Sequence, residues 1–350
     1  MRAQDFGHTP DTWHGGAPVS HFPSIDLAVA AFPAGGGMPR CANVLFSREH
    51  PQGVLGEIGP RASALRNVGF VRDVQDTKGQ SIAWQAGRNW RQIPWQPLTH
   101  RAAGPGTLRF VAPYPASLLK LMVAVGLGLA LDRGLMSAWP AALEPMITVS
   151  DNDATTACVA LLHQHRLVDV LNTRFAELGL ATLQLNDTTP SGGWRNADGA
   201  GVGHIHMTAW DTVRLLWLLD VDAPAAPWLP TGDGAAQPLM QPLLQPVTRE
   251  HLRGVLARQQ RDEILSSGSL RGLPGWLPGG PDAPAFAHKT GTTDNYASDA
   301  GIMQAGSVHY IVAVLSSLGR RYAPDPRCAT TWRLPALGAA VHRLMTDAAV

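Results

Sequence analysis

The fold of this chain is decided by residues 115–131, PASLLKLMVAVGLGLAL. Pro115 suits the first turn of a helix, because proline has a fixed φ and lacks the N–H that would be unpaired there. Nearly every later residue of the stretch is apolar, and Gly134 is a suitable helix stop. We therefore predict a helix that is buried on all sides, with Ser117 and Lys120 one turn apart on the same face.

A lysine in such a helix has unusual chemistry. Desolvation favours the neutral amine of Lys120, and a neutral amine beside the Ser117 hydroxyl is a base beside a nucleophile. The helix N-terminus also places backbone N–H groups near any oxyanion that forms there. The alternative is a structural lysine whose aliphatic stem lies along the apolar surface while its ammonium reaches water.

The distribution of lysines favours the catalytic interpretation. The chain has 28 lysines and arginines together, but its lysines are only Lys78, Lys120 and Lys289. Lys289 lies in the sequence HKTGT at 288–292, and Ser-Asp-Asn occupies 150–152. The motifs Ser-x-x-Lys, Ser-Asp-Asn and Lys-Thr-Gly occur together in class A β-lactamases and penicillin-binding proteins. The chain thus resembles the serine β-lactamase and D-Ala-D-Ala peptidase superfamily, and class A most closely.

The resemblance implies a role for each motif residue. Ser117 would attack a carbonyl carbon and become acylated, while Lys120 would take its proton directly or through a water molecule. Ser150 would relay a proton to the departing nitrogen, with Lys289 holding its hydroxyl in place. The backbone N–H groups of Ser117 and Thr292 would form the oxyanion hole. The implied substrate-binding residues, for a side-chain amide and a carboxylate, are Asn152, Thr290, Gly291 and Thr292.

Each motif also has a purely structural interpretation. The Ser-Asp-Asn turn could be only a helix cap, and Lys-Thr-Gly could be only the end of a strand and a turn. The joint occurrence of the three motifs argues against this. Residues 277–280, LPGG, and 298–302, SDAGI, add to the similarity with class A enzymes, which covers roughly residues 107–316.

The chain departs from class A at the position of the glutamate that activates the deacylating water. Aligned from Leu178, that position falls near Thr189, and no glutamate occurs between Glu177 and Glu250. Asp187 or Asp198 would have to act in its place with a shorter side chain. We therefore expect slow release of a β-lactam acyl group.

The spacing of the motifs also differs from the family. The interval from Ser117 to Ser150 is shorter than the family leads us to expect, and the interval from Ser150 to Lys289 is longer. Insertions at 186–203 and 220–246 account for the added length. Long loops in compact domains are often functional, so we expect a reshaped cleft and a different substrate.

Pattern and resemblance agree on the fold class. We predict an α/β protein of the β-lactamase/transpeptidase-like type, with an antiparallel sheet flanked by helices plus an all-helical subdomain. Residues 1–40 should be an irregular lead-in with one short helix at 24–32, and residues 41–350 a single catalytic domain. Its sheet part should span about 41–112 and 285–350, and its helical part about 113–284. The predicted strands are 41–46, 68–74, 81–86, 107–111, 286–290, 300–305 and 309–316, and the predicted helices 115–131, 139–145, 151–165, 168–178, 208–219, 247–265 and 335–345.

Composition limits the partners. The net charge is +1 and charged residues are spread evenly, which argues against nucleic acid and membrane surfaces as partners. The 11 tryptophans are better explained by packing than by base stacking. No segment reaches the roughly 18 apolar residues that a membrane span needs. The expected partner is a small molecule, a β-lactam or a related peptide or ester.

Other site chemistries have weaker support. The pairs His163/His165 and His204/His206 raise the question of zinc, but no third ligand stands at a telling spacing. We therefore predict no metal and no cofactor. The cysteines at 41, 158 and 328 favour free thiols, although one disulfide remains an alternative.

The compartment is not decided by the sequence. Residues 1–23 contain no basic region followed by an apolar one, so we see no signal peptide. Members of the superfamily usually act in the periplasm or outside the cell.

Three functions follow. The first is a β-lactamase-like serine hydrolase that acts through an acyl-enzyme on β-lactams or related amides and esters that carry a carboxylate. The second is a D,D-peptidase, esterase or amidase that releases β-lactams slowly. The third is a penicillin-binding sensor with negligible turnover.

Overall fold

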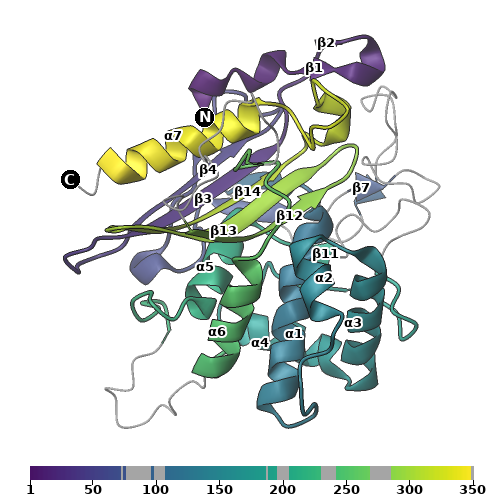
Figure 1. Cartoon of the computed structure of the whole chain (residues 1–350). Helices are drawn as coiled ribbons and strands as arrows, with labels where there is room; N and C mark the ends of the chain where they lie inside the picture. Colours follow the sequence, from purple (N-terminus) through teal and green to yellow (C-terminus); the bar gives the residue numbers. More distant parts are fainter. Residues whose placement is uncertain are drawn as a thin grey trace.

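A six-stranded antiparallel sheet forms the centre of the molecule (Figure 1). The computed structural model describes residues 1–71, 74–75, 96–97, 107–186, 188–194, 205–229, 242–268 and 285–347. In spatial order the strands of the sheet are β12 (Ala285–Thr292), β13 (Ala297–Ala305), β14 (Val308–Ser316), β3 (Ile25–Phe32), β4 (Arg40–Phe46) and β5 (Val54–Leu55). Both ends of the chain thus contribute to one sheet, and β12 lies at its edge.

Helices cover both faces of this sheet. The C-terminal helix α7 (Arg333–Asp347) lies with the N-terminal segments on one face (Figure 1). The helical part lies on the other face and comprises α1 (Lys120–Asp132), α2 (Leu143–Thr148), α3 (Asn152–Gln164), α4 (Leu167–Glu177), α5 (Ala209–Leu219) and α6 (Pro246–Leu256). The predicted antiparallel sheet with flanking helices and a helical subdomain is confirmed.

The predicted helix at 24–32 is wrong, because these residues form strand β3 in the middle of the sheet. The sequence IDLAVAAF is buried along almost its whole length, between β14 and β4. A strand covered on both faces shows no alternation of polar and apolar residues, so its pattern cannot be distinguished from that of a short buried helix. The sheet therefore begins within the range that we expected to be an irregular lead-in.

Several boundaries also differ from the predictions. The helix predicted at 139–145 is α2 at 143–148, because Pro145 can be accommodated in a first helical turn. The helix predicted at 247–265 ends at Leu256, and residues 259–266 instead make tertiary hydrogen bonds. The predicted strand at 68–74 is divided into β6 (Val68–Val71) and β7 (Val74–Gln75). The predicted strand at 81–86 and Lys78 lie outside the described residues.

The remaining described strands are short pairs outside the main sheet. They are β1 (Pro10–Asp11) with β2 (Ala17–Pro18), β6 with β9 (Leu108–Val111), β7 with β8 (Gln96–Pro97), and β10 (Gln184–Leu185) with β11 (Ile205–His206). The β6–β9 pair is parallel, and β9 leads directly into the segment that carries Ser117.

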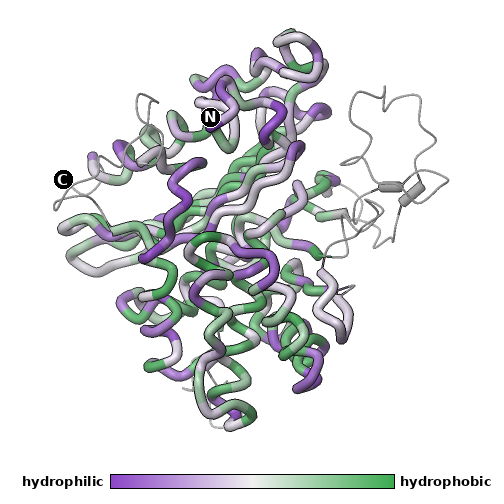
Figure 2. The backbone as a smooth tube through the Cα atoms, turned by 45° about the vertical axis from the view of Figure 1, so that its right-hand side comes forward, coloured by the Kyte–Doolittle hydropathy of each residue, from purple (hydrophilic) through white to green (hydrophobic). Residues whose placement is uncertain are grey.

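Helix α1 is the buried centre of the helical part, as its composition predicts. Its residues from Lys120 to Ala130 are all buried. A Cβ on Gly126 would lie 2.8 Å from Leu162 of α3, and one on Gly128 would lie 2.9 Å from Thr248 of α6. These glycines therefore let the neighbouring helices approach closely. The tube in Figure 2 is predominantly hydrophobic along the central strands and in parts of the helices that pack beneath them.

Candidate active site

The segment that carries Ser117 is pressed against the edge strand of the sheet. Ser117 lies in a short 3-10 helix, η7 (Ala116–Leu119), directly before α1. A Cβ on Gly291 of β12 would lie 2.4 Å from the Pro115 carbonyl oxygen and 2.5 Å from the Leu118 nitrogen. The Ser298 hydroxyl also donates a hydrogen bond to that carbonyl. Only a residue without a side chain permits this backbone contact, which brings Lys-Thr-Gly beside Ser-x-x-Lys.

Two residues of the site have a left-handed backbone. Ala116, directly before Ser117, has a φ of 51°, and Ser150 has a φ of 60°. This conformation is unfavourable for residues other than glycine and concentrates at functional sites. Ser117 and Ser150 both remain partly exposed, so their hydroxyls lie near solvent.

Lys120 is fully buried, and its ammonium faces the Ser-Asp-Asn turn. Its Nζ donates to the Ser150 carbonyl oxygen at 2.7 Å, to the Ser150 Oγ at 3.1 Å and to the Asn152 Oδ1 at 3.0 Å. The Asp151 carbonyl oxygen is a fourth acceptor at 3.3 Å. Asn152 thus contacts Lys120 directly. These bonds join the lysine to the turn, and Ser117 lies one helical turn before it in the sequence.

Asp151, the middle residue of the turn, caps a helix, which is the structural role that we considered for the whole Ser-Asp-Asn motif. The Asp151 side chain accepts a hydrogen bond from the Ala154 backbone nitrogen at 2.6 Å and caps α3. This cap fixes the start of the helix, and Ser150 and Asn152 on either side then reach Lys120. The helix-cap interpretation therefore holds for Asp151 alone.

Lys289 approaches the same serine from the strand. Its Nζ donates to the Ser150 Oγ at 3.1 Å and to the Thr290 carbonyl oxygen at 2.6 Å, and its side chain is fully buried. Burial, together with the charges of Lys120 and Arg261, lowers the pKa of Lys289 well below its ordinary value. The carboxylates of Asp299 and Glu263 oppose that shift. A buried amine with a lowered pKa gives up its proton more readily than an exposed lysine does.

The open edge of β12 also presents backbone groups to the site. The Thr293 nitrogen donates to the Tyr296 carbonyl oxygen, and Thr292 pairs with Ala297 in the adjacent, non-hydrogen-bonded position. By the alternation of an antiparallel ladder, the N–H of Thr292 points away from β13 and towards the open edge. The role of Thr292 in an oxyanion hole stays a prediction. Thr290 is buried, and its carbonyl oxygen accepts from Lys289.

The loop at the class A glutamate position is docked on helix α3. A Cβ on Gly192 would lie 2.2 Å from the Thr156 carbonyl oxygen, and the Thr188 hydroxyl lies 2.9 Å from His163 Nε2. The Thr189 hydroxyl bonds within its own loop, to the Ser191 hydroxyl and the Gly193 nitrogen, each at 2.9 Å. The alternative acids Asp187 and Asp198 lie outside the described residues.

Sequence reasoning missed one residue of this loop. The indole ring of Trp194 lies over the Lys120 ammonium, with 5.4 Å between Nζ and the ring centroid, and Trp194 is 7% exposed. A tryptophan face attracts a cation and excludes water from it. The chain has 11 tryptophans, so composition alone could not single this one out.

Sequence reasoning also missed Arg261, on the segment after α6. Its Nε donates to the Val149 carbonyl oxygen at 3.4 Å, one residue before Ser150, and its Nη1 lies 3.5 Å from Glu263 Oε1. The side chain is 51% exposed and adds positive charge beside Lys289. A guanidinium here suits a substrate carboxylate.

One histidine of each pair has a hydrogen-bond partner. His206 Nδ1 lies 2.8 Å from the Thr182 carbonyl oxygen, and His163 contacts Thr188 as described above. Within the described ranges, no cluster of three or more His, Cys, Asp or Glu side chains could hold a metal ion. His204 lies outside those ranges. The thiols of Cys41, Cys158 and Cys328 are free.

The sequence of the last third of the chain identifies its relatives. Residues 233–332 match the Beta-lactamase enzyme family. That range contains strands β12 and β13 in full, with Lys289, Thr290 and Gly291. Over these residues the chain is similar to β-lactamases. A search of curated protein sequences gave no match to this β-lactamase-like chain.

Solved structures similar to this chain include PBP-A and several β-lactamases. PBP-A is 21% identical, with 67% of this chain and 82% of that chain covered and a TM-score of 0.47. The β-lactamase from Sphaerobacter thermophilus is 16% identical, with coverage of 67% and 84% and a TM-score of 0.48. The β-lactamase from Chitinophaga pinensis is 14% identical, with coverage of 93% and 94% and a TM-score of 0.48.

None of the helices in the described part of the chain combines the length and the apolar character that crossing a bilayer requires.

Proposed function

We propose that Ser117 is the nucleophile of this hydrolase and forms a covalent acyl-enzyme with an amide or ester that carries a carboxylate. β-Lactams are the leading substrate class. The observation that carries the proposal is the Ser150 hydroxyl, which accepts hydrogen bonds from both Lys120 and Lys289. Two buried lysines around one partly exposed serine form a proton-transfer group, and burying two amines for a structural role alone would be costly.

The proposed acylation step follows from these contacts. The Ser117 oxygen bonds to the carbonyl carbon, and its proton passes to the neutral amine of Lys120, directly or through water. The N–H groups of Ser117 and Thr292 receive the oxyanion. When the carbon–nitrogen bond breaks, the Ser150 hydroxyl gives its proton to the leaving nitrogen. Ser150 regains a proton from the ammonium of Lys120, and Lys289 orients the hydroxyl.

Substrate binding uses the remaining motif residues. Asn152 bonds to Lys120 through Oδ1, which leaves its amide N–H groups for a substrate carbonyl oxygen. A substrate carboxylate is held by Thr290 and Thr292, supported by the charges of Lys289 and Arg261. Water then hydrolyses the ester bond to Ser117 and restores the free enzyme.

A second candidate function is supported by the loop at the class A glutamate position. Thr189 stands near that position, and its hydroxyl is bonded within the loop. A threonine is not a general base, so an enzyme that depends on it releases acyl groups slowly. This favours a D,D-peptidase, esterase or amidase that β-lactams acylate durably. A penicillin-binding sensor would acylate in the same way but lack turnover of any substrate.

The test is incubation of the full chain with a fluorescent penicillin, followed by intact mass and peptide mapping. The proposal expects one adduct, on Ser117, which is absent in Ser117→Ala. A transient adduct with rapid nitrocefin hydrolysis supports a β-lactamase. A persistent adduct supports the second candidate if p-nitrophenyl esters or D-Ala-D-Ala peptides are turned over, and the sensor if they are not. An unlabelled protein, or equal labelling of Ser117→Ala, contradicts the proposal.

A further inference from the structure

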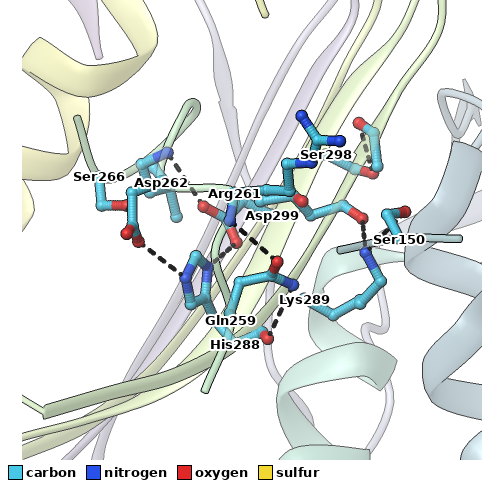
Figure 3. Close-up of polar contacts among 12 residues, drawn as sticks. Ser150, Gln259, Arg261, Asp262, Ser266, His288, Lys289, Ser298 and Asp299 are labelled. Carbon is cyan, nitrogen blue, oxygen red and sulfur yellow. Dashed lines mark hydrogen bonds and ion pairs between the residues drawn. The ribbon is translucent and has the colours of Figure 1, made fainter. Parts of the chain in front are cut away.

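A chain of three ionisable side chains, two of them buried, lies next to Lys289 (Figure 3). His288 Nδ1 lies 2.8 Å from Asp299 Oδ1, and His288 Nε2 lies 3.1 Å from Asp262 Oδ1. His288 is 1% exposed and Asp299 is fully buried. His288 and Asp299 lie in stretches that resemble class A enzymes, but no role was predicted for either, and the proposed reaction does not use them. Buried charge nevertheless requires a reason.

The sheet is built to accommodate this chain. In the β12–β13 ladder His288 pairs with Gly301 and Thr290 pairs with Asp299, so His288 and Asp299 are diagonal neighbours on one face. A Cβ on Gly301 would lie 2.4 Å from the His288 Cβ, so a glycine opposite the imidazole makes room for it. Side chains alternate along a strand, and Lys289 therefore leaves β12 on the face opposite His288, where its Nζ reaches the Ser150 hydroxyl.

The same chain fastens residues 259–266, which we call the edge segment. At one end of it, Gln259 donates to the Ile147 carbonyl oxygen of α2 on the helical side of the sheet. At the other end, Ile264 and Leu265 belong to the apolar cluster beneath α7 on the opposite side. The edge segment thus wraps around the open edge of β12. Asp262 within it bonds to His288, and the Leu265 nitrogen donates to Asp299 Oδ2 at 3.0 Å.

We propose that the Asp262–His288–Asp299 chain is a positioning device, which locks the edge segment onto β12 and so holds Lys289 and Arg261 beside Ser150. This inference rests on the proposed function, because it concerns the residues of that site. His288 acts through its neighbours and touches no substrate. Its protonated ring donates to both carboxylates, so each bond is charge-assisted and stronger than a neutral one.

Charged groups of both signs surround this device. Lys289 is faced by Lys120 from α1, by Arg261 and Glu263 from the edge segment and by Asp299 from β13. Burial by itself lowers the pKa of His288, but the charge of Asp299 and the hydrogen bond to Asp262 raise it to about 9. The imidazolium and its two carboxylates together carry one net negative charge. This charge favours the protonated form of Lys289, whose side chain leaves the other face of the strand.

The molecule contains a matched control. His309 Nε2 lies 2.6 Å from Asp220 Oδ2, and Asp220 is 2% exposed. His309 pairs with Gln304, and Gln304 pairs with Ala285, so this second histidine–aspartate pair lies at the other end of β12, away from Lys289. Variants His309→Gln and Asp220→Asn therefore break a similar buried bond outside the site.

The first experiment measures the acylation rate of the full chain by fluorescent penicillin. Asp262→Asn and His288→Gln should slow acylation about tenfold, while His309→Gln and Asp220→Asn stay within about twofold of the unmodified protein. Melting temperatures are measured in parallel, and Asp262→Asn, whose side chain is 29% exposed, serves if His288→Gln does not fold. Equal losses in the site and control variants of matched stability would overturn the inference.

The second experiment does not need activity. Because the chain has three lysines, selective carbon-13 labelling at Cε gives three lysine signals, and Lys289→Arg identifies the signal of Lys289. Asp299→Asn should move the titration midpoint of Lys289 down by about one pH unit, and His288→Gln should move it up, with no change in Asp220→Asn. An unchanged midpoint in both site variants refutes the inference even if penicillin labels Ser117. Failure to label the unmodified protein refutes the proposed function while this titration still tests the positioning role.

Discussion

Lys120 and Lys289, 169 positions apart in the sequence, each place an ammonium nitrogen 3.1 Å from the hydroxyl of Ser150. One comes from the central buried helix and the other from the edge strand of the sheet. Two like charges at one acceptor favour loss of a proton from one of them, which is what proton transfer during acylation requires. Ser150 is therefore the residue whose removal is most informative.

Replacing Ser150 should separate catalysis from stability. Ser150→Ala removes the shared acceptor, and we expect acylation by a fluorescent penicillin to slow by about 10² to 10⁴-fold. Ser150→Gly removes the same hydroxyl but relieves the φ of 60°, so it should be as slow as Ser150→Ala and more stable by about 1 kcal/mol. Stopped-flow labelling and urea unfolding measure the two effects. Acylation of Ser150→Ala at the unmodified rate would exclude Ser150 from the reaction.

Replacing Gly291 should displace the edge strand. An added Cβ meets backbone atoms of Pro115 and Leu118 that cannot move independently, so Gly291→Ala should cost about 1–3 kcal/mol and reduce acylation. Gly254→Ala in α6 is the control, because the nearest atom to its Cβ is the end of the Arg258 side chain at 3.7 Å. The control should be neutral or more stable by roughly 0.5–1 kcal/mol. Denaturant unfolding distinguishes them, and a fully active, stable Gly291→Ala would contradict the backbone contact.

Trp194 should protect the Lys120 ammonium from water. Trp194→Leu removes the aromatic face, and we expect a loss of about 0.5–2 kcal/mol of stability together with slower acylation. Trp194→Phe keeps an aromatic face and should retain most of the acylation rate. The acylation rates of the two variants test this. Equal rates would show that Trp194 acts through packing and not through its aromatic face.

The free energy of unfolding should depend on pH through His288. Its pKa is about 9 in the folded chain, above the ordinary value of 6.5, so the folded state binds its proton more tightly than the unfolded state. The stabilisation is complete below about pH 6.5 and is lost as the pH rises through 9, with an upper limit of about 3 kcal/mol. Urea unfolding between pH 6.5 and 9.5 should show this decline, and His288→Gln should flatten it. A parallel decline in His288→Gln would assign the effect to other groups.

Local sequence determined those parts of the fold whose signals lie within a few residues. The apolar run after Ser117 predicted a buried helix, and the strands predicted at 286–290, 300–305 and 309–316 are parts of β12, β13 and β14. The three motifs also indicated which positions should meet, because their residue types are useful only together. The contacts among Lys120, Ser150, Asn152 and Lys289 lie where that reasoning placed them, and their catalytic roles remain predictions.

Tertiary structure alone decided the rest. Strand β3 is a strand because neighbours on both sides complete its hydrogen bonds, and its own apolar sequence suits a helix equally well. His288 lies between two carboxylates only because packing brings Asp262 and Asp299, which belong to other segments, against its ring. A long apolar run determines its own burial. The choice between strand and helix in a short apolar run, and the partner of a buried charge, depend instead on the packing of distant segments.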